Sequence, residues 1–109
     1  MKLILAIVNK FDSKTVVSEL MKGGFSTTVV ASQGGFLRNG TATLLLGTHA
    51  ERVDYAIEIL KHTCRSRKYD INKVTREYRP IVENEYENKE IVVGGATVFV
   101  LNIEESIKI

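Results

Sequence analysis

The sequence predicts an α+β fold whose elements follow the order strand, helix, strand, strand, helix, strand. Three features carry this prediction: a short apolar run near the N-terminus, two segments with apolar residues at helical spacing, and two β-rich runs joined by a glycine-rich stretch. The chain has 109 residues, 44% of them hydrophobic and 26% charged, which is typical of one globular domain. We therefore expect a single domain over residues 1–109.

The first strand and the first helix are predicted from residues 2–24. Residues 2–8 read Lys-Leu-Ile-Leu-Ala-Ile-Val, a continuous apolar run typical of a buried central strand. Asp12 and Ser13 are good N-cap residues, because their side chains accept hydrogen bonds from free backbone N–H groups. The apolar face of the helix is formed by Val16, Val17, Leu20 and Met21. Lys22-Gly23-Gly24 then ends it, with a cation in the last turn and glycine for the left-handed cap.

Two further strands and the second helix follow. Residues 25–31 are rich in Thr and Val, and residues 41–46 form a third strand closed by Gly47, so we expect a hairpin. Residues 48–51, Thr-His-Ala-Glu, have the form of a capping box, in which the two side chains satisfy each other's backbone N–H groups. The helical pattern after this box is the strongest in the chain, and one face carries Val53, Ala56, Ile57, Leu60 and Cys64.

A polar stretch, residues 65–90, separates the second helix from the last strand. Its first half is basic and its second half acidic, and the alternation in residues 71–87 would allow a projecting two-stranded arm around Pro80. A loop of this length in a small domain is usually functional. Apolar strand follows at residues 91–93 and 96–101, interrupted by Gly94-Gly95, where we expect a bulge or a close approach. With both helices on one face, the element order is that of a ferredoxin-like fold.

Composition and motif spacing exclude several classes of function. A formal charge of +2 does not indicate nucleic-acid binding, and no apolar run is long enough for membrane insertion. The lone Cys64 cannot form an internal disulfide, which fits a cytoplasmic protein. A triphosphate-binding loop is excluded because Thr41 stands where its lysine belongs and a strand follows instead of a helix. No nucleophile, base and orienting group can be assembled, so we expect no enzyme activity and no cofactor.

The glycine-rich stretch between the second and third strands is unusual for a turn. Residues 32–41 read Ser-Gln-Gly-Gly-Phe-Leu-Arg-Asn-Gly-Thr, with Phe36 and Leu37 at the centre, whereas ordinary turns favour Gly, Asn and Asp. Such a loop presents apolar surface beside bare backbone N–H groups, which suits a ligand with a flat base and an anionic phosphate. The same two side chains could instead plug the core beneath the hairpin, and the residues alone leave both interpretations open.

Several segments together resemble the PII-like cyclic-di-AMP receptors of Gram-positive bacteria. They are residues 1–8, Gly34-Gly35-Phe36-Leu37, Glu51-Arg52-Val53-Asp54, Cys64-Arg65-Ser66-Arg67 and residues 93–101. The resemblance covers the chain except much of residues 68–89. It implies a ferredoxin-like homotrimer with three ligand sites between subunits, a non-enzymatic signalling role and a long loop that responds to ligand.

The resemblance also implies a set of ligand-binding residues: Ser26, Thr28, Gly35, Phe36, Leu37, Thr41, Gly47 and Phe99. The three apolar side chains would stack on or enclose adenine rings, while the Thr28 hydroxyl and the backbone N–H groups of the loop would donate to phosphate or base edges. Two positions depart from the family pattern, since Ser26 stands where arginine is typical and Thr41 where asparagine is. Arg38, on the loop itself, is a candidate to restore part of the missing charge.

The leading hypothesis is a trimeric receptor that binds cyclic-di-AMP or a related nucleotide and signals to a protein partner through residues 65–90. An alternative is a structural or interaction trimer without a small ligand, in which Phe36 and Phe99 are core or interface residues. A third hypothesis is a metal-binding relative that uses His62, Cys64 or the glutamates of the polar stretch. The spacing of His62 and Cys64 disfavours it, because side chains two apart on a helix point to different faces.

Overall fold

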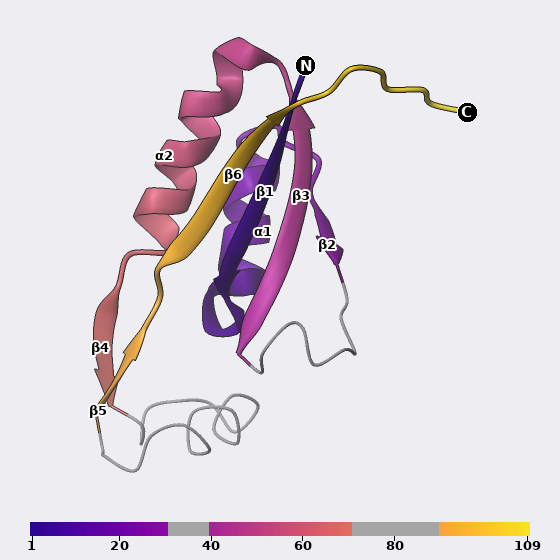
Figure 1. Cartoon of the computed structure of the whole chain (residues 1–109). Helices are drawn as coiled ribbons and strands as arrows, with labels where there is room; N and C mark the ends of the chain where they lie inside the picture. The colour runs from indigo at the N-terminus through magenta and orange to yellow at the C-terminus, as the bar shows by residue number, and fades with distance from the viewer. Residues whose placement is uncertain (31–39, 71–89) are drawn as a thin grey trace.

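The structure is a computed structural model that describes residues 1–30, 40–70 and 90–109. Its main layer is an antiparallel sheet of four strands, with two helices packed on one face (Figure 1). In space the strands follow the order β2 (Thr28–Val30), β3 (Thr41–Thr48), β1 (Lys2–Asn9), β6 (Ala96–Asn102). This is the strand order of a ferredoxin-like fold, so the predicted fold class is confirmed.

The core lies between the sheet and the helices α1 (Ser13–Lys22) and α2 (Val53–Thr63). Every second residue of the two central strands points into it, since side chains alternate between the faces of a sheet. The buried residues of these strands are Ile4, Ala6 and Val8 in β1 and Leu44 and Leu46 in β3, and the helical region supplies Val16, Leu20, Ala56, Leu60 and Cys64. Most of the predicted apolar positions therefore form the core or pack against it, but Ile57 does not belong to this cluster, and Ile59 packs against the core in its place.

Met21 and Phe25 do not lie where the sequence pattern places them. Met21, expected on the buried face of α1, is 63% exposed, and it lines a surface hollow with Val29 beside the short edge strand β2. Phe25, expected in the second strand, is a core residue whose backbone N–H donates to the carbonyl oxygen of Leu20 at 2.9 Å. The guanidinium of Arg52 lies 4.4 Å from the centre of its ring. Phe25 thus belongs to the turn that ends α1 and not to β2.

Neither predicted helix cap makes its side-chain hydrogen bond, although Asp12 does lie at the predicted position. Asp12 occupies the N-cap position of α1, but its side chain makes no capping hydrogen bond in the described structure, because its carboxylate pairs with Arg67 instead. Thr48 is the buried last residue of β3, where it pairs with Lys2, and it lies one position before the N-cap residue. The chain then enters α2 through η2 (Ala50–Arg52), a 3-10 turn whose N-cap residue is His49.

The polar stretch after α2 begins and ends as a ribbon of two paired strands. Strand β4 (Arg67–Asp70) and strand β5 (Glu90–Val93) run antiparallel in a sheet of their own, which projects beyond the main layer (Figure 1). This agrees with the predicted arm at its base and corrects the assignment of residues 91–93 to the last strand. Pro80, about which the arm was expected to turn, lies outside the described residues.

Gly94 and Gly95 connect the ribbon to β6, and both have positive φ, 95° and 81°. A Cβ atom on Gly94 would lie 2.2 Å from the carbonyl oxygen of Arg65, whereas one on Gly95 would meet no described atom within 4 Å. The close approach expected at this pair is therefore confirmed, and it occurs at Gly94.

These two glycines form a matched pair for a stability test. Both alanine variants must adopt left-handed backbone geometry, which costs about 1–2 kcal/mol. Gly94→Ala must also displace the backbone of Arg65, at a further cost of about 1–3 kcal/mol. We expect the free energy of unfolding in urea to fall distinctly more for Gly94→Ala than for Gly95→Ala. Equal losses would show that the close approach at Gly94 contributes nothing to stability.

Candidate ligand-binding site

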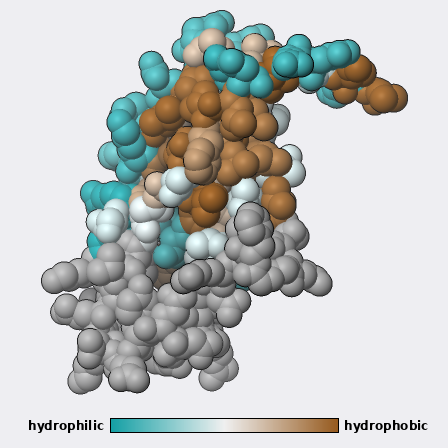
Figure 2. All heavy atoms as spheres, viewed as in Figure 1, coloured by the Kyte–Doolittle hydropathy of each residue, from teal (hydrophilic) through white to brown (hydrophobic). Residues whose placement is uncertain are grey.

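One face of the main sheet is left uncovered by the described parts of the chain. Because Ile4 and Ala6 point into the core, Leu5 must point to the opposite, open face. The strand register continues this position across the sheet in one row, Thr28, Leu45, Leu5 and Phe99. Figure 2 shows this face, with hydrophobic atoms gathered over β6, β1 and β3. Phe99 is 50% exposed and Leu101, on the same side of β6, is 45% exposed.

The predicted site residues that the structure describes lie on or beside this open face. Thr41 and Gly47 alternate with the buried Leu44 and Leu46, so they lie on the same side of β3 as Leu45. Ser26 is exposed and lies just before β2. The structure therefore brings Thr28, Thr41, Gly47 and Phe99 to one surface. The remaining predicted residues, Gly35, Phe36 and Leu37, lie outside the described residues, as does Arg38.

These residues do not form one compact cluster within the chain, and Thr41 and Gly47 lie six positions apart on the interior strand β3. Thr28 lies on one edge strand and Phe99 on the other, separated by three strand spacings, which is about 14 Å. A single adenine ring cannot contact both positions in one subunit. We call Ser26, Thr28, Thr41 and Gly47 the β2–β3 half-site, and Phe99 the β6 half-site.

The open face carries side chains that can hydrogen-bond to a ligand or stack on it. Its β2–β3 half-site offers hydroxyl groups, which donate and accept hydrogen bonds, and its β6 half-site offers an aromatic ring for stacking. A Cβ atom on Gly47 would lie 3.9 Å from the nearest described side chains, so packing within the chain leaves room for a side chain there. A glycine at this position instead leaves the backbone open to close approach from outside the subunit.

Of the proposed metal ligands, His62 and Cys64 are not brought together, and Glu83, Glu85 and Glu87 lie outside the described residues. His62 is exposed and Cys64 is buried, so the two side chains lie on different sides of the helix end. Among the described residues, no three His, Cys, Asp or Glu side chains cluster in a way that could hold a metal ion. Burial raises the pKa of the Cys64 thiol, so this side chain is neutral at physiological pH.

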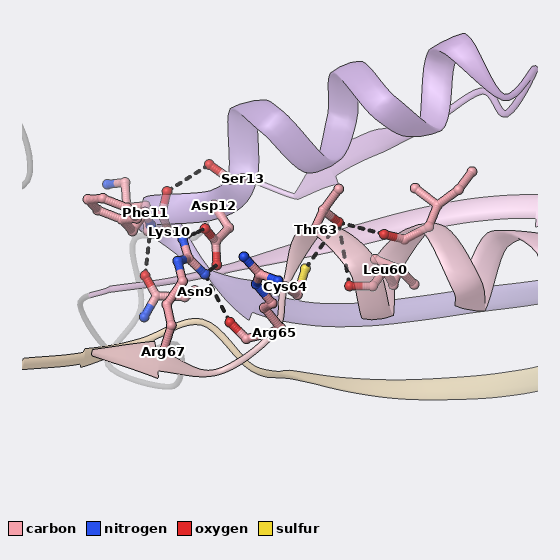
Figure 3. Close-up of polar contacts among 11 residues, drawn as sticks. Asn9, Lys10, Phe11, Asp12, Ser13, Leu60, Thr63, Cys64, Arg65 and Arg67 are labelled. Atoms are coloured by element: carbon pink, nitrogen blue, oxygen red, sulfur yellow. Dashed lines mark hydrogen bonds and ion pairs between the residues drawn. The ribbon is translucent and has the colours of Figure 1, made fainter. Parts of the chain in front are cut away.

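A buried ion pair at the base of the ribbon is the contact that sequence reasoning missed. The Arg67 guanidinium donates to both carboxylate oxygens of Asp12, at 2.5 and 3.4 Å, and the carboxylate side chain is only 4% exposed (Figure 3). The two residues lie 55 positions apart, so no local spacing connects them. The sequence pattern predicts only a helix cap for Asp12, and Arg67 stands in the Cys64-Arg65-Ser66-Arg67 segment that carries the family resemblance.

In the described part of the chain, every helix is too short or too polar to cross a lipid bilayer.

Comparison with known proteins agrees with this architecture. A solved structure from Pediococcus pentosaceus ATCC 25745, a functionally unknown protein, is similar with a TM-score of 0.73 and 28% sequence identity, over 99% of this chain and 96% of that chain. The sequence also matches the family described as "Cyclic-di-AMP receptor" over residues 1–109. This family is PII-like and non-enzymatic, in agreement with the fold and with the binding chemistry of the open face. Because the match spans all of its residues, the chain belongs to the cyclic-di-AMP receptor family.

Proposed function

We propose that this protein is a cytoplasmic, single-domain receptor that binds cyclic-di-AMP or a related nucleotide between the subunits of a homotrimer. Ligand binding is then signalled to a protein partner through residues 65–90. The observation that carries the proposal is the gathering of Thr28, Thr41, Gly47 and Phe99 on one open face, in a chain of the cyclic-di-AMP receptor family.

The apolar character of the open face supports assembly of subunits. A sheet must bury its apolar face against another layer, and the described chain covers only the face that carries the helices. Exposed Phe99 and Leu101 continue the apolar surface of Leu3 and Leu5 to the sheet edge. Large contiguous apolar patches of this kind usually mark interaction sites. A second and a third copy of the chain would cover this surface.

The separation of the two half-sites supports a ligand position between subunits. About 14 Å separates Thr28 from Phe99 within one chain, as the strand spacing requires. Two copies packed side by side would bring the β6 half-site of one subunit to the β2–β3 half-site of the next. One dinucleotide could then be stacked on Phe99 of one subunit and hydrogen-bonded by Thr28 of the other, with Phe36 and Leu37 closing over it.

The choice of nucleotide depends on two altered positions. Ser26 lacks the charge and the planar donor fork of the arginine that is typical of the family, and Thr41 lacks the amide of its asparagine. Loss of one charge-assisted hydrogen bond costs about 1.5–3 kcal/mol, which corresponds to an affinity roughly ten- to a hundred-fold lower. A related nucleotide that needs no such contact is therefore included in the proposal.

Isothermal titration calorimetry tests the ligand directly. We expect saturable heat with cyclic-di-AMP at one ligand per subunit, and weaker or no heat with cyclic-di-GMP, ATP and AMP. Saturable binding of one of these other nucleotides alone would support the related-nucleotide form of the proposal. Absence of heat with every nucleotide at high micromolar concentration would instead support the ligand-free interaction trimer.

Phe36→Ala separates the receptor from the interaction trimer. If Phe36 stacks on a base, its loss removes about 1–3 kcal/mol of binding, an affinity loss of roughly 5- to 150-fold, and leaves assembly unchanged. Sedimentation of the wild type and the variant should give the same mass, three times the 12.2 kDa of one chain. Unfolding or dissociation of the variant would show that Phe36 is a core or interface residue.

Two substitutions test whether a positive charge at the site strengthens nucleotide binding: Arg38→Ala removes one and Ser26→Arg adds one. If Arg38 contacts the phosphate groups, its truncation should lower nucleotide affinity by roughly ten-fold or more, since a charge-assisted hydrogen bond is lost. Ser26→Arg should raise the affinity for cyclic-di-AMP, because it restores the charge typical of the family. An unchanged dissociation constant for Arg38→Ala in calorimetry would exclude Arg38 as a ligand contact.

A further inference from the structure

The base of the ribbon is held to the helical layer by one charged side chain. Arg67 is the first residue of β4, and its guanidinium lies against the carboxylate of Asp12 in a two-pronged contact. The same guanidinium donates to the carbonyl oxygen of Arg65 at 2.9 Å and lies 5.8 Å from the centre of the Phe11 ring. Arg67 therefore fixes where the ribbon leaves the body of the protein.

Asp12 belongs to η1 (Lys10–Asp12), a short 3-10 turn between β1 and α1. At its other end, the backbone N–H of Lys10 donates to the carbonyl oxygen of Gly40 at 2.6 Å. Gly40 is the residue at which the chain returns from the glycine-rich stretch into β3. One short turn thus contacts both Gly40, at the end of the predicted ligand loop, and Arg67, at the base of the predicted signalling arm. Figure 3 shows the second of these contacts.

Local hydrogen bonds hold η1 together as one unit. The side chain of Asn9 accepts a hydrogen bond from the backbone N–H of Phe11 at 2.8 Å. The hydroxyl of Ser13 donates to the carbonyl oxygen of Lys10 at 3.0 Å. Because these hydrogen bonds tie both ends of η1 to its neighbours, we expect η1 to move as one unit. A shift of Gly40 would then be transmitted to Asp12.

The two side chains of the ion pair are buried to different extents. This difference makes the pair a latch, by which we mean a contact that is either fully formed or fully broken. The side chain of Arg67 is 29% exposed and keeps access to water, whereas that of Asp12 is 4% exposed. If the pair broke while the carboxylate kept its burial, Asp12 would be left unpaired, which is strongly unfavourable. The ribbon is therefore either docked with the pair formed or released together with a rearrangement of η1.

We propose that the Asp12–Arg67 pair and η1 couple nucleotide binding at the open face to docking of the β4–β5 ribbon. This inference rests on the proposed function and names the residues that transmit the signal. Because such coupling is reciprocal, a ligand that stabilises the contact of η1 with Gly40 favours the docked ribbon, and release of the ribbon weakens ligand binding. Asp12 and Arg67 are positioning residues that act through η1.

The only cysteine of the chain is a built-in reporter for this latch. Cys64 is 2% exposed, and its carbonyl oxygen accepts a hydrogen bond from the backbone N–H of Gly95, at the seam between α2 and the ribbon. The charge of Asp12 raises the pKa of the thiol, and the charge of Arg67 lowers it. Release of the ribbon would open this seam, and the rate at which Cys64 reacts with a thiol reagent would rise.

The test compares Arg67→Met with a matched control, Lys61→Met, which breaks the exposed ion pair of Lys61 with Glu58. The reaction of Cys64 with Ellman's reagent is followed in the ligand-free protein and at saturating cyclic-di-AMP. We expect Arg67→Met to react at least ten-fold faster than the wild type, and Lys61→Met to react within two-fold of it. The Arg67 charge lowers the thiol pKa, so its loss alone would slow the reaction.

Ligand should slow the reaction of the wild type and have little effect on Arg67→Met. Nucleotide affinity, measured by calorimetry, should fall at least five-fold in Arg67→Met and stay unchanged in Lys61→Met. The double variant Asp12→Asn with Arg67→Met leaves no buried unpaired charge, so it provides a folded protein if Arg67→Met alone is unstable. It should show the same loss of ligand-dependent protection.

Equal Cys64 reactivity in wild type and Arg67→Met would overturn the latch. Suppose that the wild type binds ligand without a change in Cys64 reactivity and that the variants bind with unchanged affinity. This result would overturn the coupling, while the proposed function would stand. Absence of nucleotide binding to the wild type would overturn the proposed function and the coupling to ligand, and the ligand-free comparison would still decide whether Arg67 holds the ribbon.

Discussion

The structure depends on one central strand that is apolar on both of its faces. On one face of β1, Ile4, Ala6 and Val8 are buried beneath the helices. On the other, Leu3, Leu5 and Ile7 lie on the open surface of the sheet, where they pair with residues of β3 and β6. A strand of this composition is stable when both faces are covered, and the described chain covers one. The proposed assembly of copies would cover the second face.

The C-terminal end of β1 also organises polar parts of the molecule. This end runs directly into η1, which contacts Gly40 on one side and the β4–β5 ribbon on the other through Asp12. The segments that the proposed function uses for ligand and for partner therefore meet at the end of the strand that carries the apolar face. In the proposed function, binding and signalling would be connected by packing around one short turn.

Much of the fold could be predicted from the sequence, because the core uses simple periodicity. The apolar run of β1 and the helical faces of α1 and α2 each bury a continuous set of side chains, so local pattern and final structure agree. The errors arose where a distant side chain decides the local geometry. The Arg52 guanidinium packs over the ring of Phe25 at the end of α1, and the Asp12 carboxylate pairs with Arg67 instead of capping the helix.

The candidate site could be predicted only in part. Thr28, Thr41 and Gly47 share a face because alternation and register place them there, and Phe99 joins them through β1. Alternation within one chain does not reveal that Phe99 lies at the opposite edge from Thr28. The Asp12–Arg67 pair could not be predicted, since its partners lie 55 positions apart on different elements and no local spacing connects them.

The most direct test of a ligand shared between subunits is complementation in mixed trimers. Phe36→Ala and Phe99→Ala chains, each deficient in nucleotide binding alone, are co-expressed, and cyclic-di-AMP binding to the mixed trimers is measured by calorimetry. If Phe36 of one subunit and Phe99 of the next contact the same ligand, random mixing restores about one quarter of the sites to wild-type affinity. If no high-affinity site returns, each ligand is held within one subunit and the account is contradicted.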